Sequence, residues 1–104
     1  MDSENPTKAR PAFIVNLVSN RKIPVRIPRC TVGRHDDNDI VIGDDKSISG
    51  SHFEVITKDG RYLLHDANSR YGTFLNGNKI EQAEPVADGD VIKAGVSLFW
   101  FVVE

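Results

Sequence analysis

The chain has 104 residues, of which 39% are hydrophobic and 27% are charged, so it is long enough for one globular domain and too short for two. Its formal net charge of -2 argues against a broad nucleic-acid-binding surface. Cys30 is the single cysteine and has no disulfide partner in the chain, so we expect a reducing, cytoplasmic location.

Along the chain, the pattern changes from a polar lead-in to that of a β protein. Residues 1–11 are polar, and we expect a flexible segment there rather than a signal peptide. From residue 12 to 104, short apolar runs alternate with Gly, Pro, Asn and Asp. We predict strands at residues 13–18, 23–27, 31–33, 40–42, 52–57, 62–66, 73–75, 79–80, 90–93 and 98–103. The longest apolar run, 98–103, is far shorter than the roughly 20 residues that cross a membrane.

Two turns between these strands are chemically well specified. Asp59-Gly60 and Asn76-Gly77 are residue pairs that tolerate the positive φ angles of a type I′ hairpin turn. Many short strands without an amphipathic helix predict an all-β fold, a two-sheet β-sandwich. Three longer loops remain, at residues 34–38, 43–51 and 67–72, and loops on a rigid β scaffold are where binding residues collect.

The three loops together carry the donors that a phosphate group requires. They offer Arg34, Arg70, several hydroxyl groups, and glycines that let backbone N–H groups approach a ligand closely. A guanidinium group binds two phosphate oxygens, and a hydroxyl or amide binds the third. Surface loops often contain these residue types, so composition alone is weak support for a phosphate site, and the order and spacing of the residues are the stronger evidence.

That order resembles the forkhead-associated (FHA) domain family. Val32-Gly33-Arg34 followed by Ser49-Gly50-Ser51-His52 resembles the first half of the family's pattern, and residues 66–77 resemble the second half. Asp88-Gly89-Asp90 matches the turn before its last strands. The resemblance covers about residues 13–103, and it implies a β-sandwich of about eleven strands whose loops at one end bind phosphothreonine in a partner protein.

The resemblance also implies roles for single residues. Arg34 would pair with the phosphate and Ser49 would hydrogen-bond to it, with Arg70 and the backbone N–H of Gly50 as further phosphate ligands. The candidate contacts to the rest of the peptide are Tyr71, Ser51 and His35. The residues expected to support the loops and turns are Gly33, His52, Gly72, Asn76 and Gly77, with His52 tying the second loop to the third.

Tyr71 departs from the family's pattern. The usual sequence is Ser-x-Asn-Gly-Thr, in which the asparagine holds the main chain of the bound peptide, and here that position is Tyr71. A phenol donates one hydrogen bond and stacks, but it does not present the paired donor and acceptor of an amide. We therefore expect phosphate binding to persist and recognition of the peptide main chain to differ.

Two other chemistries and one ion pair are compatible with some of these residues. The acidic run at residues 35–39 lacks the spacing of a calcium loop, so we expect it to shape the loop, and we predict no metal and no cofactor. Ser49, His52 and Asp66 are the residue types of a nucleophilic triad, but no nucleophile elbow accompanies them, so we predict no enzyme activity. Arg70 has the alternative of an ion pair with Asp66.

The prediction is therefore a phosphothreonine-dependent protein-binding module in Ser/Thr-kinase signalling, monomeric in isolation and the N-terminal regulatory domain of a larger protein. Its partner would be a phosphothreonine-containing protein, and neither nucleic acid nor a membrane. A second hypothesis is a phosphate-independent interaction domain that uses a sheet face or Tyr71. A third is that phosphorylated Thr7 occupies the pocket of its own or a neighbouring chain, because tethering raises the effective concentration to about the mM range.

Overall fold

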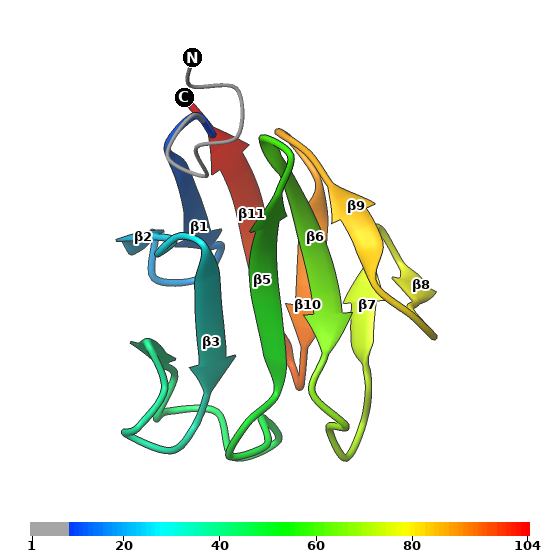
Figure 1. Cartoon of the computed structure of the whole chain (residues 1–104). Helices are drawn as coiled ribbons and strands as arrows, with labels where there is room; N and C mark the ends of the chain where they lie inside the picture. Colours follow the sequence, from blue (N-terminus) through cyan, green and yellow to red (C-terminus); the bar gives the residue numbers. More distant parts are fainter. Residues whose placement is uncertain (1–8) are drawn as a thin grey trace.

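Two β-sheets face each other in the computed structural model of the chain, which describes residues 9–104 (Figure 1). The strands are β1 (Ala12–Asn16), β2 (Lys22–Pro24), β3 (Arg29–Gly33), β4 (Ile40–Val41), β5 (Phe53–Lys58), β6 (Arg61–Asp66), β7 (Thr73–Leu75), β8 (Asn78–Lys79), β9 (Glu84–Val86), β10 (Val91–Ala94) and β11 (Ser97–Val103). The six-stranded sheet has the order β2-β1-β11-β10-β7-β8 and the five-stranded sheet the order β4-β3-β5-β6-β9. All pairs are antiparallel except β3 and β4. The predicted two-sheet β-sandwich of about eleven strands is confirmed.

One strand, β9, was not predicted from the sequence. It contains Pro85, and proline argues against a strand interior because it has no N–H to donate to a neighbouring strand. β9 lies at the edge of its sheet and pairs only with β6, so the missing N–H removes no inner ladder bond. The first strand is also shorter than predicted. It ends at Asn16 because the side-chain oxygen of that residue accepts hydrogen bonds from the N–H groups of Val18 and Ser19 and turns the chain.

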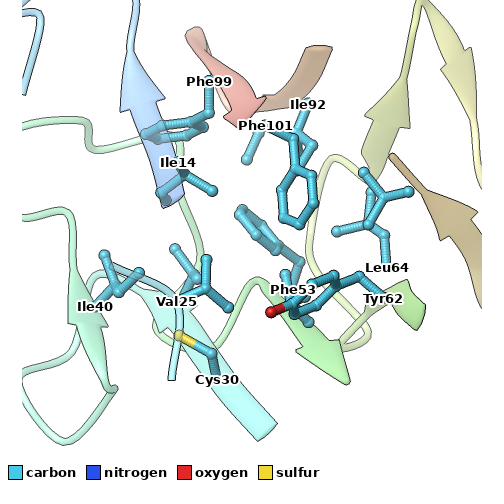
Figure 2. Packing of buried hydrophobic residues seen from close by; sticks show 14 of the residues in the cluster. Ile14, Val25, Cys30, Ile40, Phe53, Tyr62, Leu64, Ile92, Phe99 and Phe101 are labelled. Atoms are coloured by element: carbon cyan, nitrogen blue, oxygen red, sulfur yellow. The ribbon is translucent and has the colours of Figure 1, made fainter. Parts of the chain in front are cut away.

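The core lies between the two sheets and follows from alternating side chains on each strand. Inward-facing Phe99 and Phe101 of β11 meet Phe53 and Tyr62 of the opposite sheet (Figure 2). The ring centroids of Phe53 and Phe99 are 6.3 Å apart, and those of Tyr62 and Phe101 are 5.4 Å apart. Each large apolar side chain buried in this way stabilises the fold by about 1.5–3 kcal/mol relative to an exposed one. The sandwich is therefore a firm base for the loops at its ends.

Both predicted hairpin turns have the expected backbone. Asp59 and Gly60 have φ angles of 54° and 76°, and Asn76 and Gly77 have φ angles of 50° and 87°. The flanking residues pair directly across each turn, Lys58 with Arg61 and Leu75 with Asn78. The type I′ requirement for two positive φ angles is met in both turns.

The segment before β1 packs on the sandwich from residue 9 onward. Ala9 is buried, the hydroxyl of Tyr62 donates to the carbonyl of Arg10 at 2.6 Å, and the N–H of Glu104 donates to the carbonyl of Pro11 at 2.8 Å. The sequence assigned Ala9, Arg10 and Pro11 to the lead-in, whereas in the structure they contact the domain. Residues 1–8, including Thr7, lie outside the described residues. In the part of the chain that is described, none of the backbone forms a helix of the length and apolarity needed to cross a bilayer.

The loops that the sequence singled out gather at one end of the sandwich. The β3–β4, β4–β5 and β6–β7 connections lie there together with the turn between β10 and β11, at the lower end in Figure 1. The C-terminus lies at the opposite end. Side chains far apart in the sequence are therefore brought to one face.

Candidate functional site

A hollow of about 490 Å³ opens between the three loops. Arg34 comes from the β3–β4 loop, Ser49 and Gly50 from the β4–β5 loop, and Arg70 and Tyr71 from the β6–β7 loop. The four residues predicted to bind phosphate and Tyr71 thus line one hollow. We call it the cationic hollow because three positively charged side chains line it.

Three positively charged side chains line the cationic hollow. Arg34, Lys46 and Arg70 are exposed, and within residues 9–104 none of the three forms an ion pair. The Nε of Arg34 donates to the carbonyl of Ile48 at 3.1 Å, which orients the guanidinium group. Like charges held close together repel each other, so a multiply charged anion bound between them would be strongly favoured.

The hydroxyl group of Ser49 is placed to donate into the same hollow. It accepts a hydrogen bond from the backbone N–H of Arg70 at 2.9 Å. A serine hydroxyl carries one proton in addition to its acceptor sites, and among the described residues that proton has no acceptor. The same bond ties the β4–β5 loop to the β6–β7 loop.

The β3–β4 loop is pressed directly against the β4–β5 loop, and this contact places Arg34. The backbone N–H of Arg34 donates to the carbonyl of Ser49 at 3.0 Å, and the side-chain amide of Asn38 donates to the carbonyl of Gly50 at 2.6 Å. A Cβ atom at Gly33 would lie 2.1 Å from that same carbonyl oxygen, so only glycine fits there.

His52 fastens the β4–β5 loop to the β6–β7 loop from beneath the hollow. Its side chain is fully buried, its Nδ1 accepts the N–H of Ser49 at 3.0 Å, and its Nε2 donates to the carbonyl of Gly72 at 2.9 Å. These bonds require a neutral ring with the proton on Nε2. Neither nitrogen bonds the Ser49 hydroxyl, so the triad alternative lacks the hydrogen bond that would activate the serine.

A carboxylate organises the β6–β7 loop. Asp66 accepts hydrogen bonds from the hydroxyls of Ser69 and Thr73, each at 2.6 Å, and the hydroxyl of Ser69 in turn accepts the N–H of Gly72. Burial raises the pKa of Asp66, but the hydrogen bonds from Ser69 and Thr73 outweigh it and leave the pKa below its ordinary value. The carboxylate is engaged by these neighbours, and no ion pair joins it to Arg70 within residues 9–104.

Sequence reasoning missed Asp45, which holds the other side of the site. This buried carboxylate accepts hydrogen bonds from the hydroxyls of Ser47 and Ser97 and from the N–H of Val96. Burial raises its pKa, but these bonds, from Ser47 first, lower it overall. An Asp-x-Ser pattern indicates a local turn, and the structure adds partners 51 and 52 positions along the chain. Lys46 was also missed, because its place beside Arg34 and Arg70 depends on how the loops meet in the fold.

The other predicted residues lie around the cationic hollow or away from it. His35 and Ser51 are exposed and do not line it, although the His35 ring covers Gly50, where an added Cβ would lie 2.4 Å from the ring. The Asn76-Gly77 turn lies between β7 and β8, and the side chain of Asn76 bonds Asp90 and Val91 there.

The acidic run of the β3–β4 loop is tied into the fold by Asp39. Its carboxylate accepts hydrogen bonds from the N–H of Thr31 at 2.9 Å and from Arg26 at 3.0 Å. The hydrogen bond from the Thr31 backbone, together with Arg26, holds the pKa of Asp39 below its ordinary value. No cluster of metal-ligating side chains occurs in the described range 9–104.

Comparisons with known proteins show which family this chain is similar to in sequence and fold. The FHA domain profile matches residues 30–95, more than half of the chain. The transcriptional regulatory protein EmbR of Mycobacterium tuberculosis is 29% identical over 82 residues, which is 79% of this chain and 21% of EmbR. The glycogen accumulation regulator GarA of Mycolicibacterium smegmatis is 34% identical over 68 residues, 65% of this chain and 42% of GarA. The chain thus spans less than half the length of these relatives.

Solved structures agree with the sequence matches. EmbR of M. tuberculosis in complex with a low-affinity phosphopeptide superposes with a TM-score of 0.86 at 27% identity, over 91% of this chain and 25% of that one. A domain solved in a study of phosphothreonine-dependent FHA domain interactions superposes with a TM-score of 0.83 at 28% identity, over 90% of this chain and 97% of that one.

Proposed function

Since this chain belongs to the FHA domain family, we propose that its cationic hollow binds the phosphate of a phosphothreonine in a partner protein. The observation that carries the proposal is the set of three cations in one hollow that have no carboxylate partner among residues 9–104, next to a hydroxyl with a proton to donate. Arg34, Lys46 and Arg70 supply the charge, and Ser49 and the backbone N–H of Gly50 supply directed hydrogen bonds.

The binding depends on a charge switch in the partner. Phosphorylation adds about -1.5 to -2 charges and three strong acceptor oxygens to a threonine. An unmodified threonine offers none of the charge that the three cations require, so it gains little from entering the hollow. The hydrogen bonds of His52, Asp66 and Asp45 hold the loops in place before the ligand arrives, which lowers the entropy cost of binding.

The chain's part in signalling is to bind a phosphorylated partner. His52 does not activate the Ser49 hydroxyl as a base, because both of its ring nitrogens are bonded to the backbone. We place the domain in the cytoplasm, where its single, buried cysteine Cys30 stays reduced, as a monomeric regulatory module that meets its phosphorylated partner in trans. Phosphorylated Thr7 is a further partner to test, and it lies outside the described residues.

A peptide array tests the proposal. Matched peptides that differ only in carrying threonine, phosphothreonine or phosphoserine are incubated with the purified domain. The proposal expects binding of phosphothreonine peptides and far weaker binding of the other two sets. Equal binding of all three sets would overturn it.

A second candidate function has one observation in its favour. Leu98 and Trp100 of β11 are 39% and 46% exposed on the outer face of the six-stranded sheet. That face would serve the phosphate-independent interaction that the sequence left open. A partner that stays bound after Arg34→Ala and is lost after Trp100→Ala would favour this second function over phosphate recognition.

A further inference from the structure

The outer face of the six-stranded sheet carries apolar side chains at positions that face water. Alternation along β11 points Phe99 and Phe101 into the core. The outward positions of this strand are therefore Leu98, Trp100 and Val102, and those of the neighbouring strand β1 are Phe13 and Val15. An antiparallel sheet with one solvated face usually has polar residues there, so this face departs from the common pattern.

These side chains form one continuous stripe over the β1–β11 pair, two strands that lie side by side in Figure 1. Its rows are Phe13 with Val102, Val15 with Trp100, and Leu17, whose N–H donates to the carbonyl of Leu98. From Leu98 to Val102 the stripe is about 14 Å long, at about 3.4 Å per residue. We call this row of side chains the apolar stripe.

A lysine lies on each side of the apolar stripe. Lys22 belongs to β2, next to β1, and Lys93 belongs to β10, next to β11. Their Nζ atoms lie 4.3 Å from the centre of the Phe13 ring and 5.2 Å from the centre of the Phe74 ring, so both lysine stems cover the outer face. Three strand spacings separate β2 from β10, about 14 Å in all.

Negative charge is scarce on this side of the sandwich. The six strands of the sheet contain lysines but neither Asp nor Glu. Directly after β11, Glu104 pairs with Lys22, whereas Lys93 forms no ion pair within residues 9–104. The outer face of the other sheet differs, because Glu54 of β5 pairs there with basic side chains of both neighbouring strands. A partner that fits the six-stranded face must therefore combine apolar side chains with carboxylates.

The dimensions of the face favour a helix over an added strand. The edge strands β2 and β8 have three and two residues, which leaves little unpaired backbone for a strand from another chain. A helix bonds its own backbone, and about 14 Å of stripe matches two to three turns of about 5.4 Å each. Its width of about 10–12 Å also places its two flanks near Lys22 and Lys93.

We propose that the apolar stripe binds an amphipathic helix of a partner protein, whose apolar side is flanked on both edges by Asp or Glu. A second copy of this chain is a poorer fit, because a symmetric contact would bring lysines against lysines. The inference goes beyond phosphate recognition and deepens the second candidate function, because it states the partner's chemistry. No residue of the apolar stripe lines the cationic hollow, so the helix does not compete with a phosphopeptide.

The test uses a stapled helical peptide of about 18 residues, with leucines along one side, glutamates on both flanks and no tryptophan. One control peptide has the same composition in scrambled order, and another has lysine in place of each glutamate. Trp100 is the single tryptophan of the chain and lies in the apolar stripe, so its fluorescence reports burial of this face. Anisotropy of the labelled peptides gives affinities for Trp100→Ala and Lys93→Glu, with Leu63→Ala and Lys58→Glu on the other sheet as matched controls.

The glutamate peptide should bind at least about tenfold more tightly than either control peptide, and it should shift the Trp100 emission to shorter wavelength. Trp100→Ala should weaken this binding about tenfold, whereas Arg34→Ala, which removes a cation of the cationic hollow, should leave it unchanged. Lys93→Glu should weaken binding of the glutamate peptide about fivefold and strengthen binding of the lysine peptide. That gain cannot come from unfolding, so it tests the face even if Trp100→Ala folds poorly.

Equal binding of the glutamate and scrambled peptides, or none of either, would overturn the inference. Phosphothreonine-peptide binding by the same samples decides the proposed function separately. Self-association of the free domain that Trp100→Ala abolishes would assign the face to a second copy and overturn the inference. Binding to phosphatidylserine vesicles without binding to the glutamate peptide would assign it to a membrane and overturn it as well.

Discussion

The hydrogen bonds of His52 predict a large loss of stability when its ring is removed. His52→Ala leaves two backbone groups without partners, the half-buried N–H of Ser49 and the buried carbonyl of Gly72. Each such group costs about 1–3 kcal/mol, and the cavity left by a fully buried ring adds to this. The expected loss is about 3–5 kcal/mol, a large part of the roughly 5–15 kcal/mol that stabilise a domain of this size.

Urea denaturation followed by the fluorescence of the single tryptophan, Trp100, measures this loss. The matched control is His65→Ala, since His65 is partly exposed and, within residues 9–104, its ring hydrogen-bonds to the Glu54 carboxylate alone, a pair worth about 1 kcal/mol or less. At a lower denaturant concentration, where His52→Ala is still folded, its phosphopeptide affinity should also fall, because Ser49 is no longer held. If His52→Ala proved as stable as His65→Ala, the account of the loop supports would be wrong.

Three further predictions concern the loops. Gly33→Ala should cost more than about 2 kcal/mol of unfolding free energy in thermal denaturation, because the new Cβ would lie 2.1 Å from a backbone oxygen, whereas Gly43→Ala has open space around it and should be near neutral. Asp45→Asn should be about 1–2 kcal/mol less stable than the wild type at pH 7. In urea denaturation across pH, that difference should hold above about pH 4 and shrink as the pH falls through the folded pKa, since the folded pKa of Asp45 lies below its ordinary 3.8. Lys46→Ala should weaken phosphothreonine-peptide binding about twofold to tenfold by calorimetry while Lys58→Ala leaves it unchanged, and equal affinities would remove Lys46 from the site.

Much of the fold could be predicted because its signals are local. Alternating apolar residues mark β5 and β6, and the Asp59-Gly60 pair fixes the hairpin that joins them. β9 could not be predicted, because its Pro85 is acceptable only at a sheet edge, and edge position is a property of the whole sheet. The burial of Ala9 could not be predicted from the sequence either, since it depends on the strands that pack around it.

In the candidate site too, residues in local motifs could be predicted from the sequence, and residues whose roles depend on the fold could not. Arg34 and Ser49 stand in motif blocks whose spacing the sequence displays, so they could be named without a structure. The roles of Asp45 and Lys46 depend on which loops meet. The partners of Asp45 at Val96 and Ser97 lie across the sandwich end, and Lys46 becomes notable only beside Arg34 and Arg70. A second hollow beside Tyr71, which Phe74 and Val96 also line, arises in the same way, from three segments that meet only in the fold.

The most direct test of the central claim is calorimetric titration of one phosphothreonine peptide into the wild-type domain, Arg34→Ala and Arg61→Ala. Both arginines are exposed, and Arg61 lies in the β5–β6 hairpin at the other end of the sandwich. Removing one partner of a desolvated charge pair typically costs about 2–5 kcal/mol, so Arg34→Ala should weaken binding more than about tenfold while Arg61→Ala leaves it unchanged. If Arg34→Ala bound the peptide as tightly as the wild type, the phosphate would not lie in the cationic hollow.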